Sequence, residues 1–361
     1  MPITLTQLRR FALARSLFKP TTLKRAIHKL GFVQADPIRA PARAQDLTLR
    51  HRVADYRAGD LERRYAQLGI EEDFFVNYGF LPVATHALMH PRAPRSVWTK
   101  PEWAKAHAVH AFVAERGVVH PREVDAHFAH GKVQNWFGGS SNASTQLLDG
   151  MHYRGLLRVA RREAGIRLYA AREATPAPVD AQAAHDALVD VIIAKYAPLP
   201  AATLGQLVSH LGIGVPQWRG ERNAAMQRAR QRLAHVRIDG VDWYWPADER
   251  LPRRRTPIDD TVRLLAPFDP VVWDRRRFEL FWGWAYRFEA YTPPAKRQLG
   301  YYALPLLWRD EVIGWANVSA TDGKLGTEFG YVSGKAPRDP VFRRERDAEL
   351  ARLEEFLLAR N

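Results

Sequence analysis

Cysteine is absent from the 361-residue sequence, which excludes disulfide bonds, thiolate zinc sites, iron–sulfur clusters and a cysteine nucleophile. The sequence also has no run approaching the ~18 apolar residues of a membrane-spanning helix. Its first eleven residues lack the long apolar core of a secretory signal. We therefore expect a cytoplasmic protein that does not enter a membrane.

Acidic residues are outnumbered, with 39 Asp and Glu against 54 Lys and Arg, which gives a net charge of +15. In a folded chain, an excess of this size usually faces a polyanion, and nucleic acid is the leading candidate. The alternative is that the charge serves only solubility, because basicity alone specifies no fold.

Signatures of several enzyme classes are also missing. No Gly-Lys-Ser/Thr sequence follows Gly138-Gly139, so a nucleoside triphosphate loop is not expected, and no Gly-x-Ser-x-Gly elbow occurs. Histidines recur at short spacings without the glutamate of a His-Glu-x-x-His zinc motif. We therefore predict neither a metal nor another cofactor. The histidine pairs are His86/His90, His107/His110 and His127/His130.

Three stretches share one order of expected elements: a helix, a shorter helix, a third helix with a polar start, and two short strands around a turn. This is the order of a winged helix. The clearest copy has helices at 103–115 and 122–128, a third helix ending at 153, and strands at 156–162 and 166–171. Another copy has helices at 180–196, 203–211 and 221–233 and a hairpin at 236–245 that turns at Asp239-Gly240. The first copy is less regular, with helices at 5–16 and 22–30 and Gly31 at the C-cap position.

The pattern changes after about residue 251. Strands are expected at 301–307, 311–319 and 328–332, with a terminal helix at 344–358, and Trp282, Trp284, Tyr286 and Phe288 alternate as in a half-buried strand. The predicted fold class is α+β. Its domains are winged helices at 1–95, 96–175 and 176–252, followed by a small β-barrel with a C-terminal helix at 253–361.

Cations and polar groups gather on the wings, on the helix starts and among aromatic residues, where a winged helix contacts the DNA backbone. The Gly138–Asn142 segment precedes a helix, where free N–H groups favour a phosphate; an ordinary N-cap is the other interpretation. Solvated charged faces are likewise the alternative for the arginines. The predicted DNA-contacting residues are Arg43, Arg50, His51, Ser141, Asn142, Arg161, Arg162, Arg275, Arg276, Lys296 and Arg297.

The segment Gln34-Ala35-Asp36-Pro37 carries the strongest chemical pattern. Side chains alternate along an extended strand, so the amide of Gln34 and the carboxylate of Asp36 point to the same side and can both hydrogen-bond one water molecule. Pro37 favours an extended Asp36, because the residue before proline is pushed out of the helical region. The competing interpretation is that Asp36 is a turn or N-cap carboxylate ahead of Pro37.

The sequence resembles the AlkZ/YcaQ-like family of winged-helix DNA glycosylases, whose signature is glutamine, an apolar residue, then glutamine or aspartate. Gln34-Ala35-Asp36 matches the aspartate version. Supporting blocks lie at 151–163 (MHYRGLLRVARRE), 265–277 (LAPFDPVVWDRRR) and 291–297 (YTPPAKR). The sequence departs from the family pattern at Ala35, where a bulkier aliphatic residue is usual, at Gln45-Asp46, where a histidine pair is usual, and at Arg50, where tryptophan is common.

The resemblance implies a C-shaped, basic channel and catalytic positions at Gln34 and Asp36. It also implies an activity that removes N7-alkylguanines and unhooks interstrand crosslinks in double-stranded DNA. No lysine lies in the catalytic segment to form a Schiff base, so a monofunctional, hydrolytic enzyme without strand cleavage is expected. The protein is also expected to be a monomer. The alternative function is a non-enzymatic winged-helix DNA-binding protein such as a transcriptional regulator, although no coiled-coil dimerisation segment is present.

Overall fold

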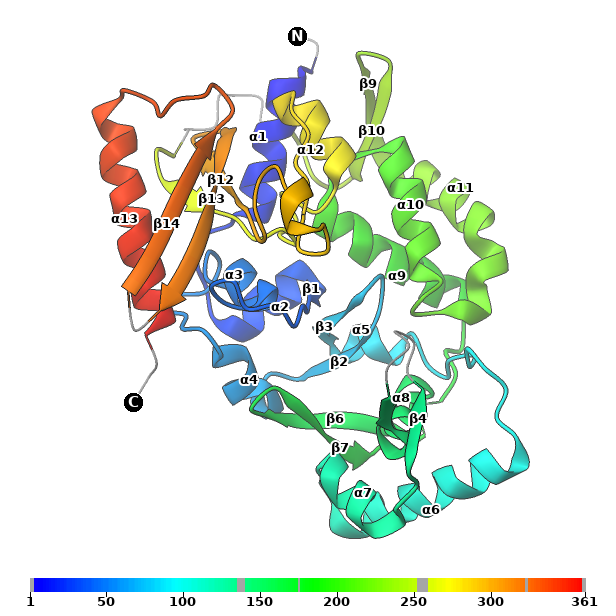
Figure 1. Ribbon diagram of the computed structural model, residues 1–361. Helices are drawn as coiled ribbons and strands as arrows, with labels where there is room; N and C mark the ends of the chain where they lie inside the picture. Colours follow the sequence, from blue (N-terminus) through cyan, green and yellow to red (C-terminus); the bar gives the residue numbers. More distant parts are fainter. Residues whose placement is uncertain (1–2, 135–139, 175, 252–258, 322–323, 359–361) are drawn as a thin grey trace. The chain divides into compact units, whose positions relative to one another are not determined.

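The computed structural model describes residues 3–134, 140–174, 176–251, 259–321 and 324–358 (Figure 1). The chain forms two compact units, and each is assembled from separate segments. The first unit contains Met1–Leu61, Asp190–Leu207 and Met226–Asn361, and the second contains Glu62–Val189 and Val208–Ala225. Each unit takes segments from several of the predicted domains, and the four-domain division stays a prediction. None of the described helices is long and apolar enough to cross a membrane.

The N-terminal part of the first unit consists of short elements with clear sequence signals. A capping box between Thr4 and Gln7 starts α1, and Thr22 caps α2. Gly31 ends α2 with φ 67°, and a Cβ there would lie 2.8 Å from a methyl carbon of Val191, so only glycine fits. The elements are α1 (Leu5–Ser16), α2 (Leu23–Leu30), β1 (Val33–Gln34) and α3 (Ala44–Leu49), and α4 (Asp60–Arg64) leads into the second unit.

Three helices follow the order predicted for the third winged helix, and each crosses from one unit to the other: α9 (Ala181–Tyr196), α10 (Ala201–Leu211) and α11 (Arg222–Arg232). In the first unit, β8 (Leu199–Pro200), β9 (Leu233–Ile238) and β10 (Val241–Pro246) form a sheet of order β8-β10-β9. The hairpin turns at Asp239 and Gly240, both with positive φ, as the sequence predicted.

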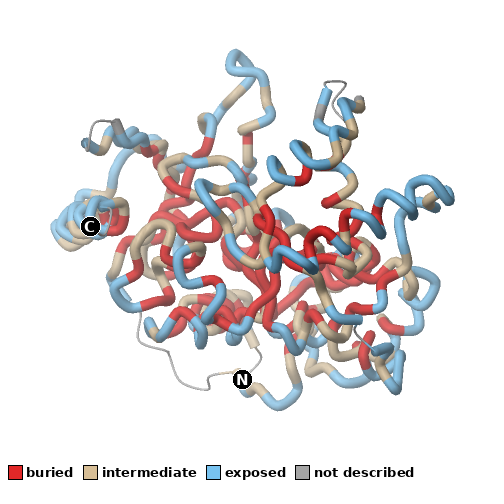
Figure 2. The backbone as a smooth tube through the Cα atoms, turned by 90° about the horizontal axis from the view of Figure 1, so that it is seen from below, coloured by how far each residue is buried: buried red, intermediate tan, exposed pale blue. Residues whose placement is uncertain are grey.

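The C-terminal part of the first unit contains an antiparallel sheet of order β11-β12-β13-β14 (Figure 1). Its strands are β11 (Val262–Leu264), β12 (Leu304–Trp308), β13 (Glu311–Thr321) and β14 (Lys324–Tyr331). The sheet is open within the described residues, so the predicted closed barrel is not found. The terminal helix α13 (Pro340–Leu357) packs against β11 and buries one narrow face, with Phe342, Glu349, Leu353 and Phe356 (Figure 2).

One short helix corrects an expectation. Trp282 is the last residue of α12 (Arg275–Trp282), which ends at Gly283 in the left-handed conformation, and the following aromatic residues do not form a strand. Tyr286 nevertheless packs into the core with Phe278 and Leu265, so the prediction that these aromatic residues are core residues holds for it. A 3₁₀ turn, η3 (Pro294–Lys296), follows.

The second unit contains the helix–helix–helix–hairpin order predicted for residues 96–175. Capping boxes start α6 at Thr99 and α7 at His120, and the core between the helices and the hairpin includes Val109, Leu148 and Val159. The elements are η1 (Tyr65–Gln67), β2 (Ile70–Phe74), β3 (Tyr78–Pro82), α5 (Val83–Ala87), α6 (Lys100–Arg116), α7 (Pro121–Phe128), β4 (Lys132–Gln134), β5 (Ser140–Asn142), α8 (Ala143–Tyr153), β6 (Leu157–Glu163), β7 (Ile166–Ala171) and η2 (Pro216–Glu221). The mixed α+β class is therefore observed, and the number of winged helices stays a prediction.

Candidate active site

Gln34 and Asp36 lie at the end of β1 and just beyond it, in the first unit. Both are nearly buried, with 8% and 9% of their surface exposed. A polar side chain at this depth is usually hydrogen-bonded, and both residues have identifiable partners. The two residues are thus part of the folded framework, and each keeps a small exposed fraction.

The carboxylate of Asp36 forms a turn with the residue after Pro37. Its Oδ1 accepts a hydrogen bond of 2.8 Å from the N–H of Ile38, and the N–H of Asp36 donates to Oε1 of Gln45 over 3.2 Å. No hydrogen bond reaches Oδ2 from any part of the chain that the structure describes. The turn interpretation of Asp36 is therefore observed, and its catalytic role stays a prediction.

Burial raises the pKa of the Asp36 carboxyl, and the N–H of Ile38 only partly opposes this effect. Water solvates a partly buried carboxylate poorly, so its charge interacts strongly with positive charge placed beside it. The ionised side chain is thus a stronger base than a surface aspartate and a good electrostatic partner for a cation.

Gln34 is held by a residue far away in the sequence. The indole Nε1–H of Trp273 donates to Oε1 of Gln34 over 3.1 Å, and the Trp273 ring lies 5.1 Å from that of Tyr196. Trp273 follows a turn anchored by Asp269, whose carboxylate forms a fully buried bidentate ion pair with Arg52 at 2.7 and 2.9 Å. The 265–277 block therefore supplies the support for the 34–36 segment.

Lys195 lies close to the catalytic segment, although it belongs to α9. Its Nζ donates to the carbonyl of Phe32 over 2.6 Å, and burial lowers the pKa of Lys195 to about 7. Only 5% of its surface is exposed. The amine thus fixes the backbone two residues before Gln34 and does not face an open site.

Two of the predicted DNA-contacting residues are used inside the first unit instead. Arg50 pairs with Glu349 and donates to the carbonyl of Leu264, and Nε2 of His51 lies 2.9 Å from the same carbonyl oxygen. Burial and the neighbouring charge of Arg50 hold the pKa of His51 well below its usual range. These side chains join the end of α3 to β11 and α13, so they have a structural role, and their contact with DNA stays a prediction.

The remaining predicted contacts in the first unit lie closer to solvent. Arg275 and Arg276 are exposed at the start of α12 and line a cavity of about 610 Å³ together with Trp273 and Arg287. Lys296 is exposed. Arg297 donates to the carbonyl of Thr292 over 2.8 Å and lies 5.0 Å from the ring centre of Tyr301, and Arg43 is partly buried just before α3. The cavity brings cations beside the tryptophan that holds Gln34.

The second unit contains the other predicted contacts. Arg161 is exposed and pairs with Glu163 at 2.8 Å, whereas Arg162 is mostly buried against Glu72 and is used inside the unit. Asn142 is exposed and its amide contacts Asp125. The backbone of Ser141 pairs with that of Val133 in the β4–β5 hairpin, and Gly138-Gly139, with the Ser141 side chain, lies outside the described residues.

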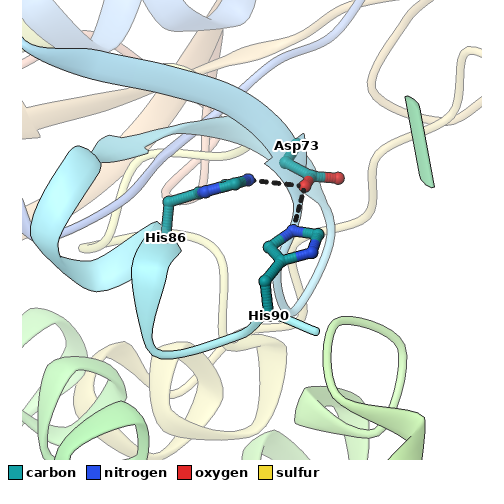
Figure 3. A group of neighbouring side chains, drawn as sticks. All are labelled: Asp73, His86 and His90. Atoms are coloured by element: carbon teal, nitrogen blue, oxygen red, sulfur yellow. Dashed lines mark hydrogen bonds and ion pairs between the residues drawn. The ribbon is translucent and has the colours of Figure 1, made fainter. Parts of the chain in front are cut away.

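A buried cluster that the sequence did not reveal lies in the second unit (Figure 3). Nε2 of His86 and of His90 lie 2.9 and 3.3 Å from Oδ2 of Asp73, a spacing that can hold a metal ion. However, Arg92 forms a bidentate pair with the same carboxylate at 2.9 and 3.1 Å. The His86/His90 spacing was a visible signal, but Asp73 comes from a strand thirteen residues earlier.

The charge of the Asp73 cluster is already balanced by protein groups. Burial alone would raise the pKa of Asp73, but Arg92 and the two histidines together hold it well below its usual range. Burial lowers the pKa of His86 to about 3, so its ring is neutral and donates to the carboxylate. A dication would have to displace or repel Arg92, so we interpret the cluster as a structural ion-pair network.

The comparisons with known proteins identify the family of the chain. A family model described as "DNA glycosylase AlkZ-like" matches residues 27–356. Among solved structures, the chain is similar to the Streptomyces sahachiroi DNA glycosylase AlkZ, with a TM-score of 0.63, 16% identity, and coverage of 99% of this chain and 97% of that chain. The structural likeness shows a shared fold, and the family model covers nearly the whole sequence. The chain therefore belongs to the AlkZ-like family of DNA glycosylases, as its sequence motifs predicted.

Proposed function

We propose that the protein is a monofunctional DNA glycosylase that hydrolyses the N-glycosidic bond of N7-alkylated purines in double-stranded DNA, including those in interstrand crosslinks. The observation that carries this proposal is the partly desolvated carboxylate of Asp36 beside Gln34, with one carboxylate oxygen bound to Ile38. Family membership supports the reaction class, and the contacts of Asp36 and Gln34 support their assignment as the catalytic residues.

The chemistry needs few protein groups because the substrate is already activated. Alkylation at N7 makes the purine a cationic leaving group, so the bond between C1′ and N9 breaks toward a positively charged, oxocarbenium-like sugar. Asp36 stabilises this charge and accepts a proton from the attacking water, an electrostatic contribution of ~3 kcal/mol in comparable sites. Gln34 orients the water through its amide.

The proposal of hydrolysis without strand cleavage rests on the position of the nearest amine. A lyase reaction needs a lysine that can attack C1′ and form a Schiff base. Lys195 is the lysine beside the catalytic segment, and its amine is buried against the carbonyl of Phe32. Water is therefore the proposed nucleophile.

DNA binding is assigned to the cationic surface of the first unit near Trp273 and to exposed Arg161 and Asn142 of the second. Arg275, Arg276 and Arg287 line the cavity beside Trp273 and are proposed to contact backbone phosphates. We further infer a monomer with three tandem winged helices, acting on DNA in the cytoplasm.

Two defined duplexes test the proposal, one with a single N7-methylguanine and one with an interstrand N7-guanine crosslink. Wild-type protein should release the base and leave an abasic site that breaks only after alkali treatment, and Asp36→Ala should abolish release. Base release by Asp36→Ala at the wild-type rate would refute the assigned mechanism. Sequence-selective binding of undamaged DNA without any base release would support a regulator instead.

A further inference from the structure

A cavity of about 680 Å³ in the first unit is lined in part by residues 39–41, which follow the 34–37 segment in the sequence. One wall is the 39–41 loop, another is Tyr301-Tyr302, and strands β13 and β14 form the floor with Asn317, Ser319 and Glu328. We call this cavity the Tyr302 groove. Its volume lies in the range of pockets that hold small organic ligands.

The hydroxyl of Tyr302 is the unusual feature of this groove. The residue is buried, with 2% of its surface exposed, and its hydroxyl oxygen has no hydrogen-bond partner among the described residues. The buried hydroxyl of Tyr286 shows the ordinary case, since it donates to the carbonyl of Ala303 over 2.8 Å. Buried polar groups without partners are costly and rare, and one on a residue that lines a cavity is a candidate contact for a ligand.

The groove is adjacent to the catalytic carboxylate. Its 39–41 wall begins three residues after Asp36, directly after Ile38, whose N–H binds Oδ1 of Asp36. Burial and then the charge of Asp36 raise the pKa of Tyr302, so its hydroxyl keeps its proton and can donate. The Tyr302 ring packs edge-on against that of Phe288, with the ring centres 5.3 Å apart, which restrains the ring.

We propose that the Tyr302 groove binds the alkylated purine base and that the Tyr302 hydroxyl donates a hydrogen bond to an acceptor on its edge. This inference rests on the proposed glycosylase function. As the C1′–N9 bond breaks, its electron pair moves into the cationic base, which leaves neutral, while the water oxygen bonds to C1′ and its proton passes to Asp36. The hydrogen bond from Tyr302 strengthens as the electron density on the base rises.

The test compares Tyr302→Phe with Tyr331→Phe, which removes a tyrosine hydroxyl from β14 away from the groove. For each protein, we would measure single-turnover release of 7-methylguanine from a defined duplex, affinity for free 7-methylguanine by calorimetry, and the thermal midpoint of unfolding. Tyr302→Phe should lose about tenfold in release and in base affinity without a fall in the midpoint, because its hydroxyl has no internal partner to lose. Tyr331→Phe should match the wild type in release and in base affinity.

Wild-type release and base affinity in Tyr302→Phe would overturn the inference, and so would a clear fall in its unfolding midpoint, which would reveal an internal partner. Failure of the wild-type protein to release any base would refute the proposed function by itself. In that case, binding of free 7-methylguanine by the wild type and its loss in Tyr302→Phe would still identify the groove as a purine site.

Discussion

Trp273 donates its indole N–H to Oε1 of Gln34 over 3.1 Å, across 239 residues of sequence. An indole nitrogen can only donate, so the carbonyl end of the Gln34 amide must face Trp273. The NH₂ end then points away from the indole. Gln34 is therefore expected to act as a hydrogen-bond donor toward water or substrate.

Replacing Trp273 with Phe should reduce base release by about five- to tenfold, because the amide of Gln34 loses the donor that sets its orientation. The phenyl ring keeps contact with Tyr196, so the unfolding midpoint should change little. Trp308→Phe is a matched control, since its indole nitrogen has no hydrogen-bond partner among the described residues. Single-turnover kinetics of both variants measure the effect, and equal rates in the two would contradict it.

Asp36→Asn should abolish base release yet stabilise the fold at neutral pH. Burial raises the pKa of Asp36, so ionisation costs the folded state stability as the pH rises through that pKa. Asparagine keeps an acceptor for Ile38 but never ionises. Urea denaturation of both proteins should give equal stability below about pH 4, where the carboxyl is protonated, and a more stable variant at pH 7. A less stable variant at pH 7 would show that the charge of Asp36 is compensated.

The buried amine of Lys195 predicts a second pH dependence of stability, with the opposite sign to that of Asp36. Its pKa is lowered to about 7 by burial, so the unfolded chain binds more protons than the folded one between that pH and about 10.5. The unfolding free energy of the wild type should therefore rise with pH in this window, by up to ~1.4 kcal/mol per pH unit. Lys195→Met should lack this rise. If urea denaturation gave parallel pH profiles of the unfolding free energy for wild type and variant, a lowered pKa of Lys195 would be excluded.

The Asp73 network should contribute strongly to stability. Asp73→Asn leaves the buried guanidinium of Arg92 without its counter-charge and should cost ~3–5 kcal/mol. Glu163→Gln breaks an exposed pair with Arg161 and should cost less than ~1 kcal/mol. Urea denaturation compares the two. A loss in Asp73→Asn no larger than that in Glu163→Gln would contradict a structural role for the cluster.

Helix ends and the hairpin turn could be predicted from the capping and turn residues of the sequence. The helix at 5–16 was predicted within the observed bounds, and Gly31 and Asp239-Gly240 occupy the positive-φ positions expected of a C-cap and a hairpin turn. These signals succeed because capping and turn geometry depend on a few neighbouring residues. Trp282 shows the limit, since its alternation with Trp284 is compatible with a strand, but the cap at Gly283 ends a helix there.

The roles of the charged residues could not be predicted in the same way. Arg50 and Arg162 both looked like DNA contacts, but each faces a buried carboxylate, Glu349 and Glu72, that is distant in sequence. An arginine has the same local pattern whether its partner is a phosphate or a glutamate. Which carboxylate forms the ion pair with each arginine is decided by the tertiary structure.

The sequence by itself determined the family and most helix boundaries, because each depends on short motifs and on backbone preferences of adjacent residues. It also predicts the pair Gln34 and Asp36 as the catalytic residues. Only the tertiary structure decided that Trp273 orients Gln34, that Asp73 joins His86 and His90, and that Tyr302 lines a groove. Those relationships join segments that local backbone preferences do not connect. Packing of the whole chain brings them together and removes the water that would otherwise satisfy each polar group.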